Sequence, residues 1–120
     1  MMEHSDIQRI RSNQVMSAAT IHNKTVYLSG QVPTRTDLDI REQTLEVFAK
    51  IDELLALANT DKSRLLSAQL FIKHLADFSN VNQLWVEWLQ GHDTPARATI
   101  QADLVNPDWL IEIAVIAAQP

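Results

Sequence analysis

Two charged side chains near the end of the chain, Arg97 and Glu112, are the first candidates for chemistry. Arginine grips a carboxylate through parallel N–H donors and stays charged. A glutamate within an apolar run is costly to bury unless a cation or hydrogen-bond donors meet it, and it can also hold water and transfer a proton. The two residue types therefore suit either acid–base chemistry on a bound carboxylate or a buried ion pair.

Both residues fall in one stretch, 94–118, that has the pattern of two strands joined by a short loop. The first half alternates polar and apolar residues, so that Arg97 shares a face with every second neighbour. A proline-containing turn at 106–108 follows, and 110–117 is apolar except for Glu112. If these strands are antiparallel partners, Arg97 is the nearest cation to Glu112. Whether the two share a face depends on the register, which the sequence leaves open.

The rest of the chain predicts two strands around a hairpin turn, a helix, a third strand and a second helix. Gly30, one of only two glycines, follows the second strand, where it allows a positive φ or a close backbone approach. Aspartates are expected to cap both helices, and a glycine to end the second one. The strands are expected at 14–21, 25–28 and 64–73, the turn at 22–24, the helices at 40–58 and 78–90, the caps at Asp37 or Asp39 and at Asp77, and the final glycine at Gly91.

The predicted order, β-β-α-β-α-β-β, is typical of an α+β fold with both helices on one face of the sheet. Two helices can cover only one face. The last strand nevertheless carries large apolar residues on both of its faces, as in 110–116. The uncovered face then needs another chain, so packing alone predicts an oligomer.

Length and composition limit the class of protein. The 120 residues suit a single domain over 1–120, and the absence of cysteine excludes disulfides, thiol catalysis and cysteine-ligated metal. The four histidines are widely spaced, so no metal site is expected. A net charge of −5 without a basic patch makes nucleic acid an unexpected partner. No apolar run reaches the length of a membrane span or a signal peptide, and a cytoplasmic location is expected.

Several ordered segments resemble one protein family. They are the SGQVP loop, the Gln43-Thr44 pair that opens the first helix, the DFSNVNQLW segment, the PAR triplet and the late IEI. Together they are similar to the RidA group of reactive intermediate deaminases, also called YjgF-like or endoribonuclease L-PSP-like proteins. The resemblance extends from about Arg11 to Ala118.

The resemblance implies a chorismate-mutase-like α+β fold, a homotrimer and three clefts between neighbouring subunits. It also implies hydrolysis of enamine and imine intermediates, such as 2-aminoacrylate and its imine tautomer, to a 2-keto acid and ammonia, without a cofactor. In the family, the arginine of the PAR motif holds the substrate carboxylate, and a late glutamate is the second catalytic group. Residue by residue, the site is then expected at Arg97, Glu112, Ser29, Gly30, Asn82, Thr99 and Met16.

Two of these positions depart from the family pattern. Thr99 stands where many characterised members carry cysteine, and Met16 aligns with an aromatic tyrosine. A non-catalytic binding or regulatory protein that uses the same cleft is therefore the alternative to an enzyme. Ribonuclease activity, a label attached to some relatives, is disfavoured by the acidic charge.

Simple structural roles are also available for four of the expected site residues. The hydroxyls of Ser29 and Thr99 suit bonds to backbone at strand ends, and Asn82 suits a local polar contact on its helix. Met16 suits packing.

Overall fold

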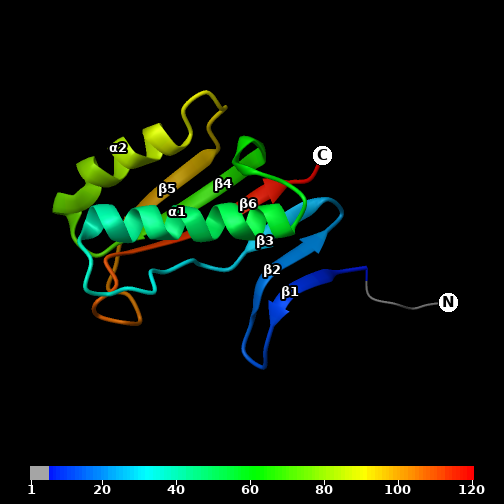
Figure 1. Ribbon diagram of the computed structural model, residues 1–120, viewed down its shortest axis with the longest axis horizontal. Helices are drawn as coiled ribbons and strands as arrows, with labels where there is room; N and C mark the ends of the chain where they lie inside the picture. The colour runs from blue at the N-terminus through cyan, green and yellow to red at the C-terminus, as the bar shows by residue number, and fades with distance from the viewer. Residues whose placement is uncertain (1–5) are drawn as a thin grey trace.

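The computed structural model describes residues 6–120, which form one six-stranded sheet with two α-helices on the same face (Figure 1). The strand order is β1-β2-β3-β6-β4-β5, and only the β4–β5 pair is parallel. The mixed sheet and the one-sided helices confirm the α+β prediction. The elements are β1 (Gln8–Ser12), β2 (Ser17–His22), β3 (Thr25–Leu28), α1 (Ile40–Leu57), β4 (Leu65–Ile72), α2 (Phe78–Trp88), β5 (Ala96–Gln101) and β6 (Ile111–Ala118), with 3-10 turns at Lys62–Arg64 and Leu75–Asp77.

The first strand, β1, was not predicted. It is a mostly exposed strand at the edge of the sheet that pairs only with β2, so it carries no apolar alternation that sequence reasoning can detect. The prediction of one strand over 14–21 is wrong in its first part, because residues 13–16 form the turn of the β1–β2 hairpin. In Figure 1 this hairpin extends away from the two helices.

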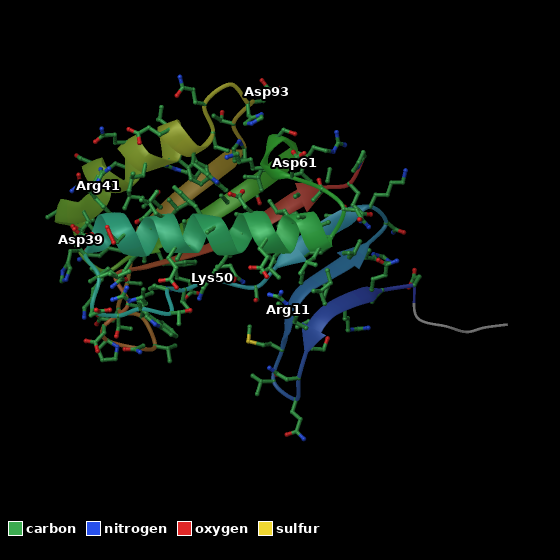
Figure 2. All side chains as sticks on the ribbon, in the orientation of Figure 1. Arg11, Asp39, Arg41, Lys50, Asp61 and Asp93 are labelled. Carbon is green, nitrogen blue, oxygen red and sulfur yellow. The ribbon has the colours of Figure 1, made fainter. Side chains whose placement is uncertain are left out.

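The second hairpin and the first helix form as their local sequences predict. Asn23 and Lys24 both have positive φ, at 51° and 62°, the backbone that a two-residue hairpin turn requires. Asp39 caps α1, because its side chain accepts a hydrogen bond from the backbone N–H of Glu42 at 2.9 Å. Figure 2 shows Asp39 at the first turn of α1. Asp37 is paired instead with the side chain of Arg35.

The ends of α2 differ from the prediction. Asp77 precedes the helix but makes no side-chain capping bond, because the 3-10 turn Leu75–Asp77 leads directly into α2. The helix ends at Trp88, before Gly91, whose φ of +86° lies in the following turn. No helix in residues 6–120 is long and apolar enough to cross a membrane.

The two strands of the stretch 94–118 are not neighbours, so the antiparallel pairing considered from the sequence does not form. β4 lies between β5 and β6, parallel to the first and antiparallel to the second. A parallel pair needs a crossover connection, and α2 supplies it between β4 and β5. The loop over 102–110 then carries the chain past β4 to β6. The turn at 106–109 is present and is closed by a bond from the N–H of Trp109 to the carbonyl of Asn106.

Candidate functional site

Arg97 and Glu112 lie on opposite faces of the sheet. Arg97 is opposite Ala68 of β4, which is 2% exposed in the core beneath the helices. Glu112 sits between Ile111 and Ile113, both fully buried on that helical side, so its own side chain points to the other face. The ion pair between these two residues, one of the alternatives left open by the sequence, is therefore excluded within one chain.

Arg97 lies against aromatic rings of α2. Its guanidinium carbon is 5.9 Å from the centre of the Phe78 ring and 5.4 Å from that of Trp85, within the range of cation–π attraction. The side chain is half-buried and makes no ion pair or hydrogen bond with another described residue. An arginine held in this way has its donors free for an anion.

A pocket of about 400 Å³ opens beside Arg97. Thr99 and Gln101, which follow Arg97 on the same face of β5, line one side, and Leu75 and Phe78 line another. The Thr99 hydroxyl oxygen is buried and has no hydrogen-bond partner among the described residues. An unpaired buried hydroxyl is costly, so a ligand atom that bonded to it would be stabilised. The pocket thus combines a free cation, a free hydroxyl and an apolar wall.

Asn82 belongs to the same group by position. It follows Phe78 by four residues and precedes Trp85 by three, which places all three on one side of α2. Its half-buried amide makes no side-chain hydrogen bond with another described residue. The structure therefore brings Arg97, Thr99 and Asn82 to one side of the sheet.

Glu112 forms a second group with the segment that follows β3. A Cβ atom placed on Gly30 would lie 2.0 Å from Oε2 of Glu112 and 2.8 Å from its carboxyl carbon. Gly30 is thus a glycine because the carboxylate occupies the space of a side chain. Its φ is not positive, so close approach is the reason for this glycine. The carboxylate itself makes no hydrogen bond or ion pair with another described residue.

Backbone and side-chain bonds fix the segment around Gly30. Gln31 exchanges two backbone hydrogen bonds with Ile113, at 2.8 and 3.1 Å, so it binds directly to β6 beside Glu112. Ser29 donates from its backbone N–H and from its hydroxyl to the carbonyl of Ala18. The Ser29 hydroxyl thus makes the backbone bond of its simple structural role.

Met16 lies in the turn between β1 and β2, 49% exposed. It is two residues from Ala18, the partner of Ser29, so it lies toward the Glu112 group rather than the Arg97 group. No described contact shows it to be a packing residue. Arg97, Thr99 and Asn82 therefore lie on the helical side of the sheet, and Glu112 lies against Gly30 on the other face. Ser29 adjoins Gly30 in the chain, and Met16 lies in the turn before β2, whose Ala18 bonds to Ser29.

Gln43 enters the sequence analysis only as part of the family resemblance. In the structure its side chain anchors the loop that precedes Glu112 by hydrogen bonds. Its side chain is fully buried, and its Oε1 accepts a bond from the N–H of Leu110 at 2.8 Å. Its Nε2 donates to the carbonyls of Leu38 and Asp108, at 3.1 and 3.2 Å. No local signal distinguishes this residue from a surface glutamine at the start of a helix, because its partner in the loop is 67 residues away.

Within residues 6–120 no group of three or more His, Cys, Asp or Glu side chains is arranged to hold a metal ion. The groups available for chemistry are therefore a cation with a hydroxyl on one face and a carboxylate on the other. The first can bind an anion, and the second can accept and return a proton.

Known proteins resemble this chain in both sequence and fold. The sequence model of the family described as endoribonuclease L-PSP matches residues 6–119. A RutC family protein from Haemophilus ducreyi is 42% identical over 112 residues, which cover 93% of this chain and 96% of the relative. A protein named 3-aminoacrylate deaminase RutC, from Acinetobacter baylyi, is 32% identical over 82% of each chain. The crystal structure of a YjgF family member from Neisseria meningitidis superposes with a TM-score of 0.92, at 34% identity over 98% of both chains.

Proposed function

Since this chain belongs to the endoribonuclease L-PSP family, also called the YjgF or RidA family, we propose that it hydrolyses small enamine and imine acids to 2-keto acids and ammonia. The substrates are of the 2-aminoacrylate and 2-iminopropionate type, which carry a carboxylate beside the reactive C=N carbon. The relative named 3-aminoacrylate deaminase supports the class, since its named substrate is also an enamine with a carboxylate. The protein would need no cofactor for this reaction.

One observation carries the proposal: Arg97 is held over two aromatic rings and pairs with no carboxylate of residues 6–120. The guanidinium holds the substrate carboxylate by two parallel N–H donors. Thr99 offers its unpartnered hydroxyl to the same ligand. An imine acid bound here has a fixed orientation, which is a large part of what this reaction needs, because water adds to such C=N bonds without a catalyst.

The second catalytic group must come from another copy of the chain. Glu112 is on the opposite face of the same sheet, so one substrate molecule cannot contact both side chains of one chain. In the proposed homotrimer, Arg97 of one subunit and Glu112 of its neighbour face each other across an inter-subunit cleft. Cyclic symmetry then generates three equal sites. The open face of the sheet becomes the subunit interface.

In the proposed mechanism Glu112 removes a proton from a water molecule as the water oxygen bonds to the C=N carbon. The electrons of the C=N bond move to nitrogen, which gives a carbinolamine. Glu112 returns the proton to that nitrogen, which leaves –OH and –NH2 on the same carbon. Glu112 then transfers the hydroxyl proton to the amine, so that the C=O bond forms, the C–N bond breaks, and ammonia leaves the 2-keto acid. Arg97 holds the carboxylate throughout and does not exchange protons.

A coupled assay tests the activity. An amino-acid oxidase generates imino acids in situ from several amino acids, and semicarbazide traps whatever imine remains. Faster loss of the trapped product with the protein than without it supports the enzyme. Absence of acceleration across the panel, with 2-keto acids still raising the melting temperature, would support the alternative, a non-catalytic binding or regulatory protein.

Substitution of Arg97 by lysine tests the carboxylate contact. Lysine keeps the charge but cannot donate two parallel, coplanar N–H bonds to a carboxylate. The value of kcat/KM should therefore fall by roughly 30- to 1000-fold, which corresponds to about 2–4 kcal/mol of activation free energy. Glu112→Gln should instead keep the affinity for pyruvate and slow turnover. Unchanged affinity for pyruvate in Arg97→Lys would refute the assigned role.

Mixing the two inactive variants tests whether the site is shared between subunits. Arg97→Lys and Glu112→Gln chains are mixed in equal amounts, unfolded and refolded together. If assembly is random, about a quarter of the interfaces then contain both native residues, Arg97 from one chain and Glu112 from the other. The mixture should then regain about a quarter of the activity. A mixture as inactive as each variant alone, with mixed assemblies shown by native mass spectrometry, would place the whole site within one chain.

A further inference from the structure

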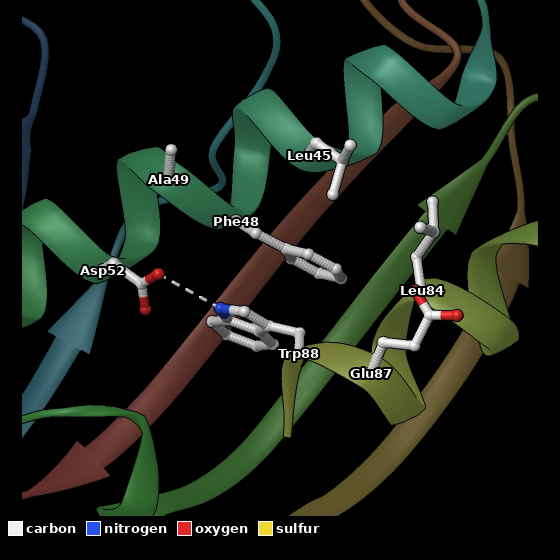
Figure 3. Close-up of a pocket in the computed structure, with 7 residues that line it drawn as sticks. All are labelled: Leu45, Phe48, Ala49, Asp52, Leu84, Glu87 and Trp88. Atoms are coloured by element: carbon white, nitrogen blue, oxygen red, sulfur yellow. Dashed lines mark hydrogen bonds between the residues drawn. The ribbon is translucent and has the colours of Figure 1, made fainter. Parts of the chain in front are cut away.

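A second pocket, of about 350 Å³, lies between α1 and α2 on the outer side of the helical layer (Figure 3). α1 contributes Leu45, Phe48 and Asp52, and α2 contributes Glu87 and Trp88. The pocket shares no lining residue with the pocket beside Arg97. It also lies on the helical side, away from the open face of the sheet that the proposed trimer buries. It is therefore a separate feature from the proposed catalytic site.

The pocket between α1 and α2 is called the helix groove below. Its inner wall is aromatic and rigid. The rings of Phe48 and Trp88 are stacked, with 4.3 Å between their centres and 4° between their planes. The indole N–H of Trp88 donates to Oδ2 of Asp52 at 3.2 Å, which Figure 3 shows as a bond across the two helices. Phe48 is 3% exposed, whereas Leu45 at the rim is 50% exposed, so apolar surface remains open to a ligand.

The polar groups at the groove are both acidic. Asp52 and Glu87 come from opposite sides of it, and neither forms an ion pair with a Lys, Arg or His side chain of residues 6–120. The nearby cation, Lys62, lies 5.3 Å from the centre of the Trp88 ring rather than on a carboxylate. Two carboxylates that are not neutralised by a cation, beside aromatic and aliphatic walls, attract a cation and repel an anion.

We infer that the helix groove is a binding site for a small organic cation, an ammonium group attached to an aromatic or branched aliphatic body. The carboxylates of Asp52 and Glu87, at the two ends of the groove in Figure 3, both attract the ammonium, and the body packs against Leu45 and the edges of Phe48 and Trp88. The volume is that of a small-ligand pocket and not of an extended peptide groove. The carboxylate substrate proposed for the Arg97 pocket is of the opposite charge and is rejected here.

The test uses 2-phenylethylammonium as the probe and the intact protein, with ¹⁵N-detected NMR as the readout. The indole N–H of Trp88 should shift on titration, and its signal is assigned by its loss in Trp88→Phe. The matched anion, 3-phenylpropionate, has a similar aromatic body and the opposite charge. We expect a dissociation constant of roughly 1 mM for the cation, as for fragments of this size, and no shift with the anion below 20 times that concentration.

Charge-removing variants locate the site. Glu87→Gln and Asp52→Asn keep the shape of each side chain, and asparagine can still accept the Trp88 bond. Each should weaken the binding of 2-phenylethylammonium by about two- to fivefold. Glu53→Gln is the control, because it removes the same charge from the next position on α1, where the carboxylate pairs with Arg11 outside the groove.

Three results would overturn the inference. The first is the absence of any Trp88 shift at 20 mM probe. The second is equal binding of the anion, which would mean apolar contact alone. The third is equal weakening by Glu53→Gln, which would mean attraction to the acidic surface in general. Because the assay measures binding at the helix groove, its outcome does not depend on the proposed deaminase activity.

Discussion

Replacing Gly30 with alanine separates the position of Glu112 from the stability of the fold. The added methyl group would meet Oε2 of Glu112 at 2.0 Å, where a tight contact needs at least 3.0 Å, so the carboxylate must move by about 1 Å. The obstacle is the flexible end of a side chain, and Gly30 does not have a positive φ. The backbone can therefore keep its place while the carboxylate leaves the position in which we expect it to hold water.

The expected result is a large loss of turnover with little loss of stability. A displacement of about 1 Å at a catalytic group costs on the order of 100-fold, so kcat/KM in the imine assay should fall by about that factor. The free energy of unfolding should change by no more than about 1 kcal/mol, because the chain entropy that alanine removes partly offsets the new contact. Affinity for pyruvate should persist, since the proposed carboxylate-binding group, Arg97, comes from the neighbouring subunit and is not displaced by the added methyl group.

The chain's other glycine is the matched control. Gly91 has φ of +86° and no atom within 4 Å of an added Cβ, so Gly91→Ala strains the backbone without touching any neighbour. It should lower stability by about 1 kcal/mol and leave kcat/KM unchanged. Both variants are compared at one protein concentration, because assembly affects the melting temperature. Full activity in Gly30→Ala would refute the role assigned to the Glu112 carboxylate.

Further predictions concern assembly, the loop anchor and acid stability. The protein should be a trimer by light scattering at micromolar concentration, and a stable monomer would remove the shared site. Gln43→Met should speed hydrogen exchange of the 104–112 amides and lower kcat more than it raises KM, whereas Thr44→Val, at an equally buried position with an unpartnered hydroxyl, should do neither. Burial raises the pKa of Glu46, but bonds from the N–H groups of Thr34 and its neighbour outweigh it and hold that pKa below 4.5. The stability that these hydrogen bonds give to the fold is present above pH 4.5 and is lost as the pH falls through the lowered pKa. Glu46→Gln should therefore reduce the fall in melting temperature on acidification.

Local features of the chain could be predicted because their causes lie within a few residues. The helix over 40–58 was predicted to within one residue, since its apolar stripe and the cap at Asp39 are both local. The turn at Asn23 and Lys24 is likewise set by its own residues. β1 was missed because an exposed edge strand lacks alternation, and its pairing with β2 is what defines it.

The sequence by itself also indicated Arg97 and Glu112 as candidates for chemistry, because a glutamate is conspicuous in an apolar strand and Arg97 is the nearest cation in the stretch before it. Their arrangement was decided only by the tertiary structure. Insertion of β4 between β5 and β6 sets the register of each strand independently, and alternation within each strand then sends the two side chains to opposite faces. The burial of Gln43 is of the same kind. Strand order and long-range contacts depend on the packing of the whole chain, and no local pattern of residues encodes them.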